Sequence, residues 1–279
     1  MSTPIHFAIN RISAPRLGFA EFAAMSRRLG VSAIEIRNDL PGVELRDGMP
    51  ASDVGAIAQA HGLTIRSINA LYPFDVFNAE RAAQATELAR YAQACGAEAL
   101  VMCPLNSLED RRSTEERYAD LVAALRGLRP ILQAHGLVGL VEPLGFEECS
   151  LRHKSVAVRA IEEVGHDGTF LLVHDTFHHH LAGENAFYPE YTGLVHVSGV
   201  EDAGLGVNQM RDGHRVLVGQ DDRLGNLPQL RRLLDLGYTG FVSFEPFAES
   251  VAAATDIEAQ LAASMAHLRD GVASLATTA

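Results

Sequence analysis

The chain has 279 residues, of which 47% are hydrophobic and 21% are charged. This balance supports a large buried core and excludes an intrinsically disordered chain. The formal net charge of −12 argues against a nucleic-acid partner, because surfaces that grip DNA or RNA carry excess lysine and arginine.

No stretch approaches the roughly 18 uninterrupted apolar residues of a membrane helix, and the start, MSTPIHFAIN, lacks a basic leader with a long apolar run. The three cysteines, Cys95, Cys103 and Cys149, are odd in number and show no C-x-x-C spacing. We therefore expect reduced thiols, a cytoplasmic location and no membrane partner. Cys103 follows an apolar run, and we interpret it as a small core residue.

Short apolar runs alternate with longer amphipathic stretches along the chain. Eight of these runs are predicted to be strands, at residues 5–9, 33–37, 64–69, 99–103, 137–142, 170–174, 193–197 and 241–245. Their continuous apolar character is typical of strands buried on both faces of a parallel sheet.

Helical patterns lie between most of these strands, and five of them end at a glycine. The predicted helices 19–29, 51–61, 79–95, 114–135 and 227–236 precede Gly30, Gly62, Gly96, Gly136 and Gly237. Glycine just past a helix supplies the left-handed conformation that closes the last turn. A further alanine-rich helix is predicted over 250–273, packed on the exterior. The polar stretch 198–226 is predicted to be a functional loop, either a lid or a substrate-binding segment.

Eight strands alternating with helices leave two architectures, a closed barrel and an open doubly wound sheet. The even count, and the absence of G-x-G-x-x-G after the first strand, favour the closed (β/α)8 TIM barrel. No proline-, glycine- or serine-rich linker divides the chain, so we predict a single domain over residues 1–279.

Ionisable residues fall at matching positions on four predicted strands. Glu142, Asp175 and Glu245 lie at strand ends, and His196 lies within the seventh strand. Strand ends converge at the mouth of a TIM barrel, where active sites are built. Each residue alone could cap a helix or pair with an arginine. Three carboxylates together would repel one another, and a divalent cation resolves that conflict. We therefore predict one metal ion, Mn²⁺, Mg²⁺, Co²⁺ or Zn²⁺, on these four ligands.

A histidine follows the second of these carboxylates by three residues. If a helix begins directly after Asp175, His178 lies on the same face of that helix and points into the mouth as a substrate contact. His179 and His180 are expected to face solvent or the barrel wall. Arg37, Asn38 and Asn69 end two early strands, where they either line the mouth or serve as structural loop residues.

These residues resemble the xylose isomerase-like TIM barrels, which include inosose isomerase, hydroxypyruvate isomerase and the ketose 3-epimerases. The resemblance spans nearly the whole chain, and the family's glutamate, aspartate, histidine and glutamate metal ligands match Glu142, Asp175, His196 and Glu245. It also implies substrate-binding roles, and the matching positions are His178, Arg215 in HRVLVGQDD, and Glu148, six residues after the first ligand. The segments EIRNDL and EPLGF look most like the inosose branch.

The resemblance implies a metal-dependent isomerase of a small polyhydroxylated ketone or sugar, possibly 2-keto-myo-inositol. Proton transfer by Glu142 and Glu245 would pass through an enediolate. The expected partner is a small polyol or ketose, and a homo-oligomer is possible.

Three alternatives stay open. The first is a ketose 3-epimerase or hydroxypyruvate isomerase on the same site. The second is a nuclease resembling endonuclease IV, whose three-metal cluster needs more histidines, and the extra ones here are His153, His174, His179 and His214. The third is a non-catalytic sugar-binding barrel.

Overall fold

A computed structural model describes residues 4–41 and 44–276. Eight parallel strands close into a barrel in chain order, with the first strand paired to the last. The strands are β1 (His6–Asn10), β2 (Ala33–Arg37), β3 (Thr64–Leu71), β4 (Ala99–Met102), β5 (Val138–Val141), β6 (Phe170–Asp175), β7 (Thr192–Val197) and β8 (Phe241–Phe244). The predicted (β/α)8 TIM barrel is confirmed, and the strand limits agree to within two residues.

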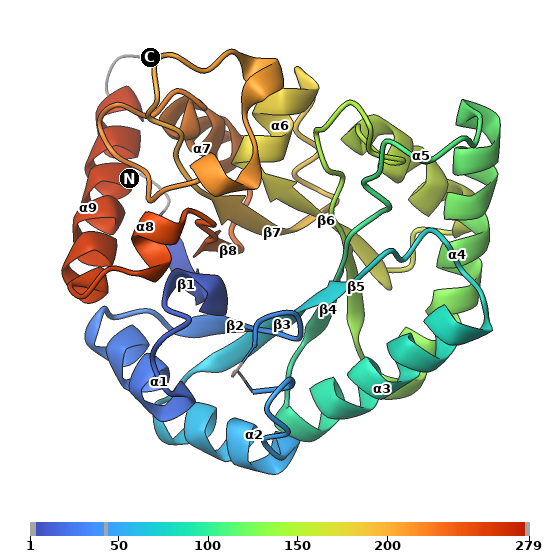
Figure 1. Ribbon diagram of the computed structural model, residues 1–279, viewed down its shortest axis with the longest axis horizontal. Coiled ribbons are helices and arrows are strands. Elements are labelled where there is room, and N and C mark those ends of the chain that lie inside the picture. Colours follow the sequence, from blue (N-terminus) through green and yellow to red (C-terminus); the bar gives the residue numbers. More distant parts are fainter. Residues whose placement is uncertain (1–3, 42–43, 277–279) are drawn as a thin grey trace.

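Helices surround the barrel on its outside (Figure 1). They are α1 (Phe19–Arg28), α2 (Ala51–Ala60), α3 (Ala79–Cys95), α4 (Thr114–His135), α5 (Lys154–Val164), α6 (Thr176–Ala182), α7 (Asn226–Asp235), α8 (Glu249–Ala252) and α9 (Ile257–Ala276). All five glycines predicted to end helices have positive φ, as the left-handed closing turn requires. Among the residues that the structure describes, no helix is long and apolar enough to cross a membrane.

The predicted helix over 250–273 is wrong in one respect, because it is two helices. The chain leaves α8 after Ala252 and starts α9 at Ile257. Thr255 and Asp256 lie in the break, and their short polar side chains favour helix starts over helix interiors. The Asp256 carbonyl accepts hydrogen bonds from the first turn of α9. The predicted exterior position is correct, since α9 packs against α7 on the outside of the barrel (Figure 1).

The barrel interior contains a small apolar cluster, separate from the larger core between strands and helices. It consists of Ala99, Val101, Leu140, Val173 and Leu194. Side chains along a strand alternate between its two faces, so every second residue points inward. Two residues beyond Leu140, Val173 and Leu194 come Glu142, Asp175 and His196. The ionisable side chains therefore form the layer directly above this apolar cluster, at the carboxyl ends of the strands.

The start of α4 gives a test of local stability. The Ser113 hydroxyl accepts a hydrogen bond from the Glu116 backbone N–H at 3.2 Å, and the Glu116 carboxylate accepts one from the Ser113 N–H at 2.7 Å. We predict that Ser113→Ala lowers the free energy of unfolding by about 1 kcal/mol, measured by urea denaturation. Ser52→Ala, at an exposed position in α2, is the control. Equal losses in both variants would contradict the capping role.

Candidate metal centre

Four ionisable side chains from consecutive late strands meet at the barrel mouth. Glu142 directly follows β5, Asp175 ends β6, His196 lies in β7 and Glu245 directly follows β8. One ligand atom from each lies within 4.8 Å of the others. None of the four residues is more than 4% exposed. The structure thus brings together all four residues predicted as metal ligands.

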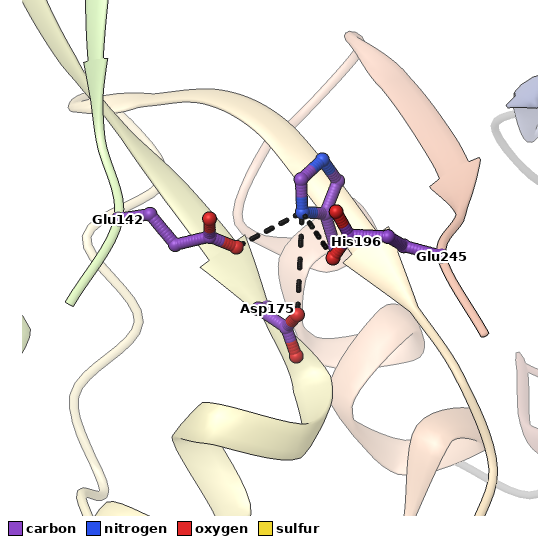
Figure 2. Close-up of side chains that lie close together, drawn as sticks. All are labelled: Glu142, Asp175, His196 and Glu245. Carbon is purple, nitrogen blue, oxygen red and sulfur yellow. Dashed lines mark hydrogen bonds and ion pairs between the residues drawn. The ribbon is translucent and has the colours of Figure 1, made fainter. Parts of the chain in front are cut away.

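The cluster centres on one ring nitrogen of His196. Its Nδ1 atom lies 2.9 Å from Glu142 Oε1, 3.1 Å from Glu245 Oε2 and 4.0 Å from Asp175 Oδ2. Figure 2 shows Glu142 and Glu245 approaching this nitrogen from opposite sides. One imidazole nitrogen and three carboxylate oxygens suit Mn²⁺, Mg²⁺, Co²⁺ or Zn²⁺. The donor set and its convergence away from solvent fit a single divalent ion.

Charge is balanced tightly within this buried layer. Burial opposes protonation of His196, but Glu245, Glu35 and Glu142 outweigh that effect and raise its pKa well above the ordinary value. Burial also opposes ionisation of Glu245, yet His196 and two arginines hold the pKa of that carboxyl well below its usual range. The Glu245 carboxylate is therefore ready as an anionic ligand, and a metal cation would compete with a proton for His196 Nδ1.

Asp175 both faces the cluster and begins a helix. Its Oδ1 atom accepts hydrogen bonds from the backbone N–H groups of Phe177 at 2.7 Å and His178 at 3.2 Å. The condition set for His178 is met, because α6 begins directly after Asp175, and Oδ2, which the cap does not use, faces the cluster and accepts from Arg215. His178 is 4% exposed, and its Nδ1 atom has no hydrogen-bond partner within the described chain.

A cavity of about 140 Å³ opens over the cluster. His178 and Arg215 line it, as the resemblance implied, and Arg37 and Asn69 line it too. Asn38 instead ties the end of β2 to β3, because its side-chain amide makes hydrogen bonds to the backbone N–H and carbonyl of Ala70. Of the three early candidates, two therefore face the mouth and one is structural.

Arg215 reaches the mouth from the predicted functional loop, where Val216 pairs with Gly199. Its Nη2 atom lies 2.6 Å from Asp175 Oδ2 and 3.1 Å from Glu245 Oε2. Nε donates to Ser198 Oγ at 2.9 Å, and the whole side chain is 1% exposed. Arg215 therefore contacts the ligand carboxylates directly, and its predicted contact with substrate stays a prediction.

Glu148 does not join the cluster. It lines a neighbouring cavity of about 340 Å³, together with Arg152 and Arg211. Phe146 lines both cavities and packs edge-on against His178, so its ring stands between Glu148 and the mouth. The substrate contact predicted for Glu148 is untested, and this arrangement places the residue one cavity away.

Two residues of the site were missed or misread in the sequence. Glu35 is fully buried on β2, with its carboxylate oxygens 3.1 and 3.2 Å from His196 Nε2. Its inward orientation could have been read from AIEIR, because Glu35 and Arg37 are two residues apart and share a face. Cys103 lines the mouth cavity, and its thiol donates to Glu142 Oε2 at 3.3 Å. Burial and Glu142 raise the pKa of that thiol, which therefore stays protonated.

Three of the four additional histidines have other partners. His174 Nδ1 and His179 Nδ1 lie 2.8 and 2.9 Å from Lys154 Nζ, and His174 Nε2 contacts Gln229. His214 accepts a hydrogen bond from the Arg211 N–H. Across the described residues, the only group of side chains arranged to hold a metal is the four-residue cluster.

The buried Lys154 predicts a pH dependence of stability. Burial lowers its pKa from 10.5 to about 7, while Glu184 opposes the shift only in part. Between about pH 7 and 10 the unfolded chain binds a proton that the folded chain does not. The free energy of unfolding should therefore rise with pH in this window, by up to about 1.4 kcal/mol per pH unit.

We predict that Lys154→Met removes this rise. The measurement is urea denaturation of both proteins at pH 7, 8 and 9, comparing wild type with the variant at each pH. Burial keeps the pKa of His174 and His179 below this window, so both stay neutral throughout it. Parallel pH profiles for the two proteins would show that Lys154 titrates normally.

The fold and the cluster define a TIM barrel with a candidate divalent-metal centre at its mouth. The sequence model of the xylose isomerase-like TIM barrel family matches residues 23–271. The chain belongs to this family.

Solved structures agree with this assignment. A xylose isomerase domain containing protein from Salmonella typhimurium LT2 is 35% identical, with a TM-score of 0.88 over 96% of this chain and 99% of that one. The IolI protein with a bound zinc atom is 22% identical, with a TM-score of 0.83 over 97% and 99%. D-Psicose 3-epimerase from Clostridium cellulolyticum H10, in a structure with D-tagatose, is 15% identical, with a TM-score of 0.75 over 96% and 99%. The last two show likeness of fold alone. A search of curated proteins gives no match.

Proposed function

We propose that the protein is a divalent-metal-dependent isomerase or epimerase of a small, uncharged polyhydroxylated ketone or sugar. The observation that carries this proposal is the convergence of Glu142, Asp175, His196 and Glu245 in one buried layer at the barrel mouth. Membership of the xylose isomerase-like family supports it. The zinc atom bound to the structurally similar IolI protein supports the metal.

Both reactions begin with removal of a proton from a carbon beside the carbonyl. Isomerisation returns a proton to the former carbonyl carbon, and epimerisation returns one to the carbon that lost it. A divalent ion, which the four ligands would hold, would supply Lewis-acid stabilisation of the negative charge that develops on the substrate. Glu142 and Glu245 approach from opposite sides of the centre (Figure 2), so one can remove a proton and the other can return it. Acid–base help of this kind contributes about 10²–10⁴-fold.

Other residues at the mouth orient the substrate. The unpartnered Nδ1 atom of His178 is available for a hydroxyl of the bound molecule. Asn69 lines the same cavity with a side chain fixed by Ser67 and Glu35. Deep burial keeps bulk water away from the reacting carbon.

The two arginines that line the cavity are both paired with carboxylates, and this favours an uncharged substrate. Arg37 Nη1 lies 2.8 Å from Glu245 Oε1, and its other nitrogens contact Asp39. Arg215 is held by Asp175, Glu245 and Asp212. Among the described residues that line the cavity, no other lysine or arginine is present. A ketose or 2-keto-myo-inositol therefore suits the site better than the carboxylate of hydroxypyruvate.

Isomerisation of 2-keto-myo-inositol is the specific activity we favour, because EIRNDL and EPLGF resemble that branch of the family. Epimerisation of a ketose at carbon 3 is the second candidate, since the same pair of glutamates can act on either side of a planar enediolate. The net charge of −12 and the single ligand cluster of the described residues favour a small molecule over nucleic acid.

The first experiment measures bound metal per chain and deuterium exchange from D₂O into 2-keto-myo-inositol. We expect about one divalent ion per chain in wild type, and at least a 100-fold loss of exchange in Glu142→Gln and His196→Ala. Glu163→Gln and His166→Ala change exposed residues and serve as matched controls. Three ions per chain would favour the nuclease alternative, and metal-independent exchange would refute the proposed mechanism.

A substrate panel tests the charge argument separately. We expect kcat/KM for 2-keto-myo-inositol or for an uncharged ketohexose to exceed that for hydroxypyruvate by at least tenfold. Among the described residues that line the cavity, both arginines are already paired with carboxylates and cannot readily bind the carboxylate of the substrate. The comparison uses the metal-loaded protein and coupled assays for each product. A preference for hydroxypyruvate would contradict the uncharged-substrate assignment while leaving the metal centre intact.

A further inference from the structure

We propose that Glu35 is a positioning residue that holds the His196 ring so that Nδ1 faces the three ligand carboxylates. This inference rests on the proposed metal centre, because it concerns how one ligand of that centre is oriented. Glu35 lies on β2, on the opposite side of the ring from the cluster, and its side chain is fully buried.

The contacts of Nε2 fix the orientation of the His196 ring. The two nitrogens of an imidazole point in different directions, so a bond at one of them fixes the direction of the other. Nε2 of His196 lies 3.1 Å from Glu35 Oε1 and 3.2 Å from Oε2. With Nε2–H donated to Glu35, Nδ1 faces the carboxylates of the centre, where a metal ion would displace its proton and bind its lone pair.

Glu35 is itself held rigidly by donors from three strands. Its Oε2 atom accepts from Ser67 Oγ at 2.6 Å and from Asn69 Nδ2 at 2.9 Å. Its Oε1 atom accepts from Ser243 Oγ at 2.5 Å and from Asn10 Nδ2 at 3.3 Å. With His196 added, five donors surround the roughly four lone-pair sites of this carboxylate. The surroundings therefore accommodate an acceptor with two oxygens and disfavour an amide.

A purely structural role does not account for the negative charge of the Glu35 carboxylate. Within the described chain, the ion pairs of Glu35 are all with His196, since neither lysine nor arginine lies within 4.0 Å of its oxygens. A buried carboxylate without a permanent cation contributes little to stability, and an apolar side chain of similar volume would serve as well or better. The carboxylate is explained by its action on His196, in the way that carboxylates behind metal-bound histidines fix the ring.

The test is the affinity of the metal-free full-length protein for Zn²⁺, measured by competition with a chelating dye. We expect Glu35→Gln to weaken Zn²⁺ binding by about 10–100-fold, and to change the visible absorption of the Co²⁺-loaded protein. Ser26→Ala is the matched control, because Ser26 on the outer helix α1 donates a buried hydrogen bond to the Phe22 carbonyl within that helix. Its affinity should equal that of wild type.

Folding of each variant is checked by circular dichroism and thermal melting. If Glu35→Gln does not fold, Ser243→Ala decides instead, because it removes one donor to Glu35 without touching the charge, and it should weaken Zn²⁺ binding several-fold. Affinities within twofold of wild type in the folded variant would overturn the inference. A wild-type protein that binds no metal would instead overturn the proposed function, and this inference with it.

Discussion

The mutual repulsion of carboxylates in one buried layer is the constraint around which the barrel mouth is built. Glu35, Glu142, Asp175 and Glu245 are each 4% exposed or less, so water cannot screen them. Arg37 and Arg215 supply two fixed positive charges, both directed at Glu245. These two charges do not match the four carboxylates, and the remainder falls to His196 or to a metal ion. A bound divalent ion would therefore contribute to the electrostatic balance of this layer as well as to the proposed chemistry.

The positions of the charged residues along the strands follow from the same need to neutralise buried carboxylates. Charged residues placed in the lower barrel would meet the apolar cluster of Val101, Leu140 and Val173, where nothing could neutralise them. Placed one layer higher, they reach Arg37 at the end of β2 and Arg215 in the loop after β7. The division of the interior into an apolar lower layer and an ionised upper layer explains how a stable barrel tolerates so much buried charge at its mouth.

The parts of this structure that follow periodic patterns could be predicted from the sequence. Continuous apolar runs located the strands, and glycines after the amphipathic stretches located the ends of five helices. Ionisable residues at or near the strand ends located the four residues of the cluster. The parts that depend on three-dimensional packing could not. Glu35 stands in an apolar strand, where its spacing from Arg37 indicates an inward orientation, but its contact with His196 depends on how β2 and β7 face each other across the barrel. Whether Glu148 contacts a substrate also depends on packing, and Phe146, which contacts His178 and Phe177, lines both the cavity beside Glu148 and the mouth cavity. The break before α9 was hidden because an alanine-rich composition suits both sides of it.

Arg215 connects the 198–226 loop to a residue of the metal centre, which the sequence of the loop alone does not indicate. Asp175 has committed Oδ1 to the start of α6, so only Oδ2 remains for any other partner, and that atom lies 2.6 Å from Arg215. A cation bound at Oδ2 would share that oxygen with Arg215, and the two positive charges would repel each other. Metal occupancy and the attachment of the 198–226 loop at Asp175 would therefore be thermodynamically linked.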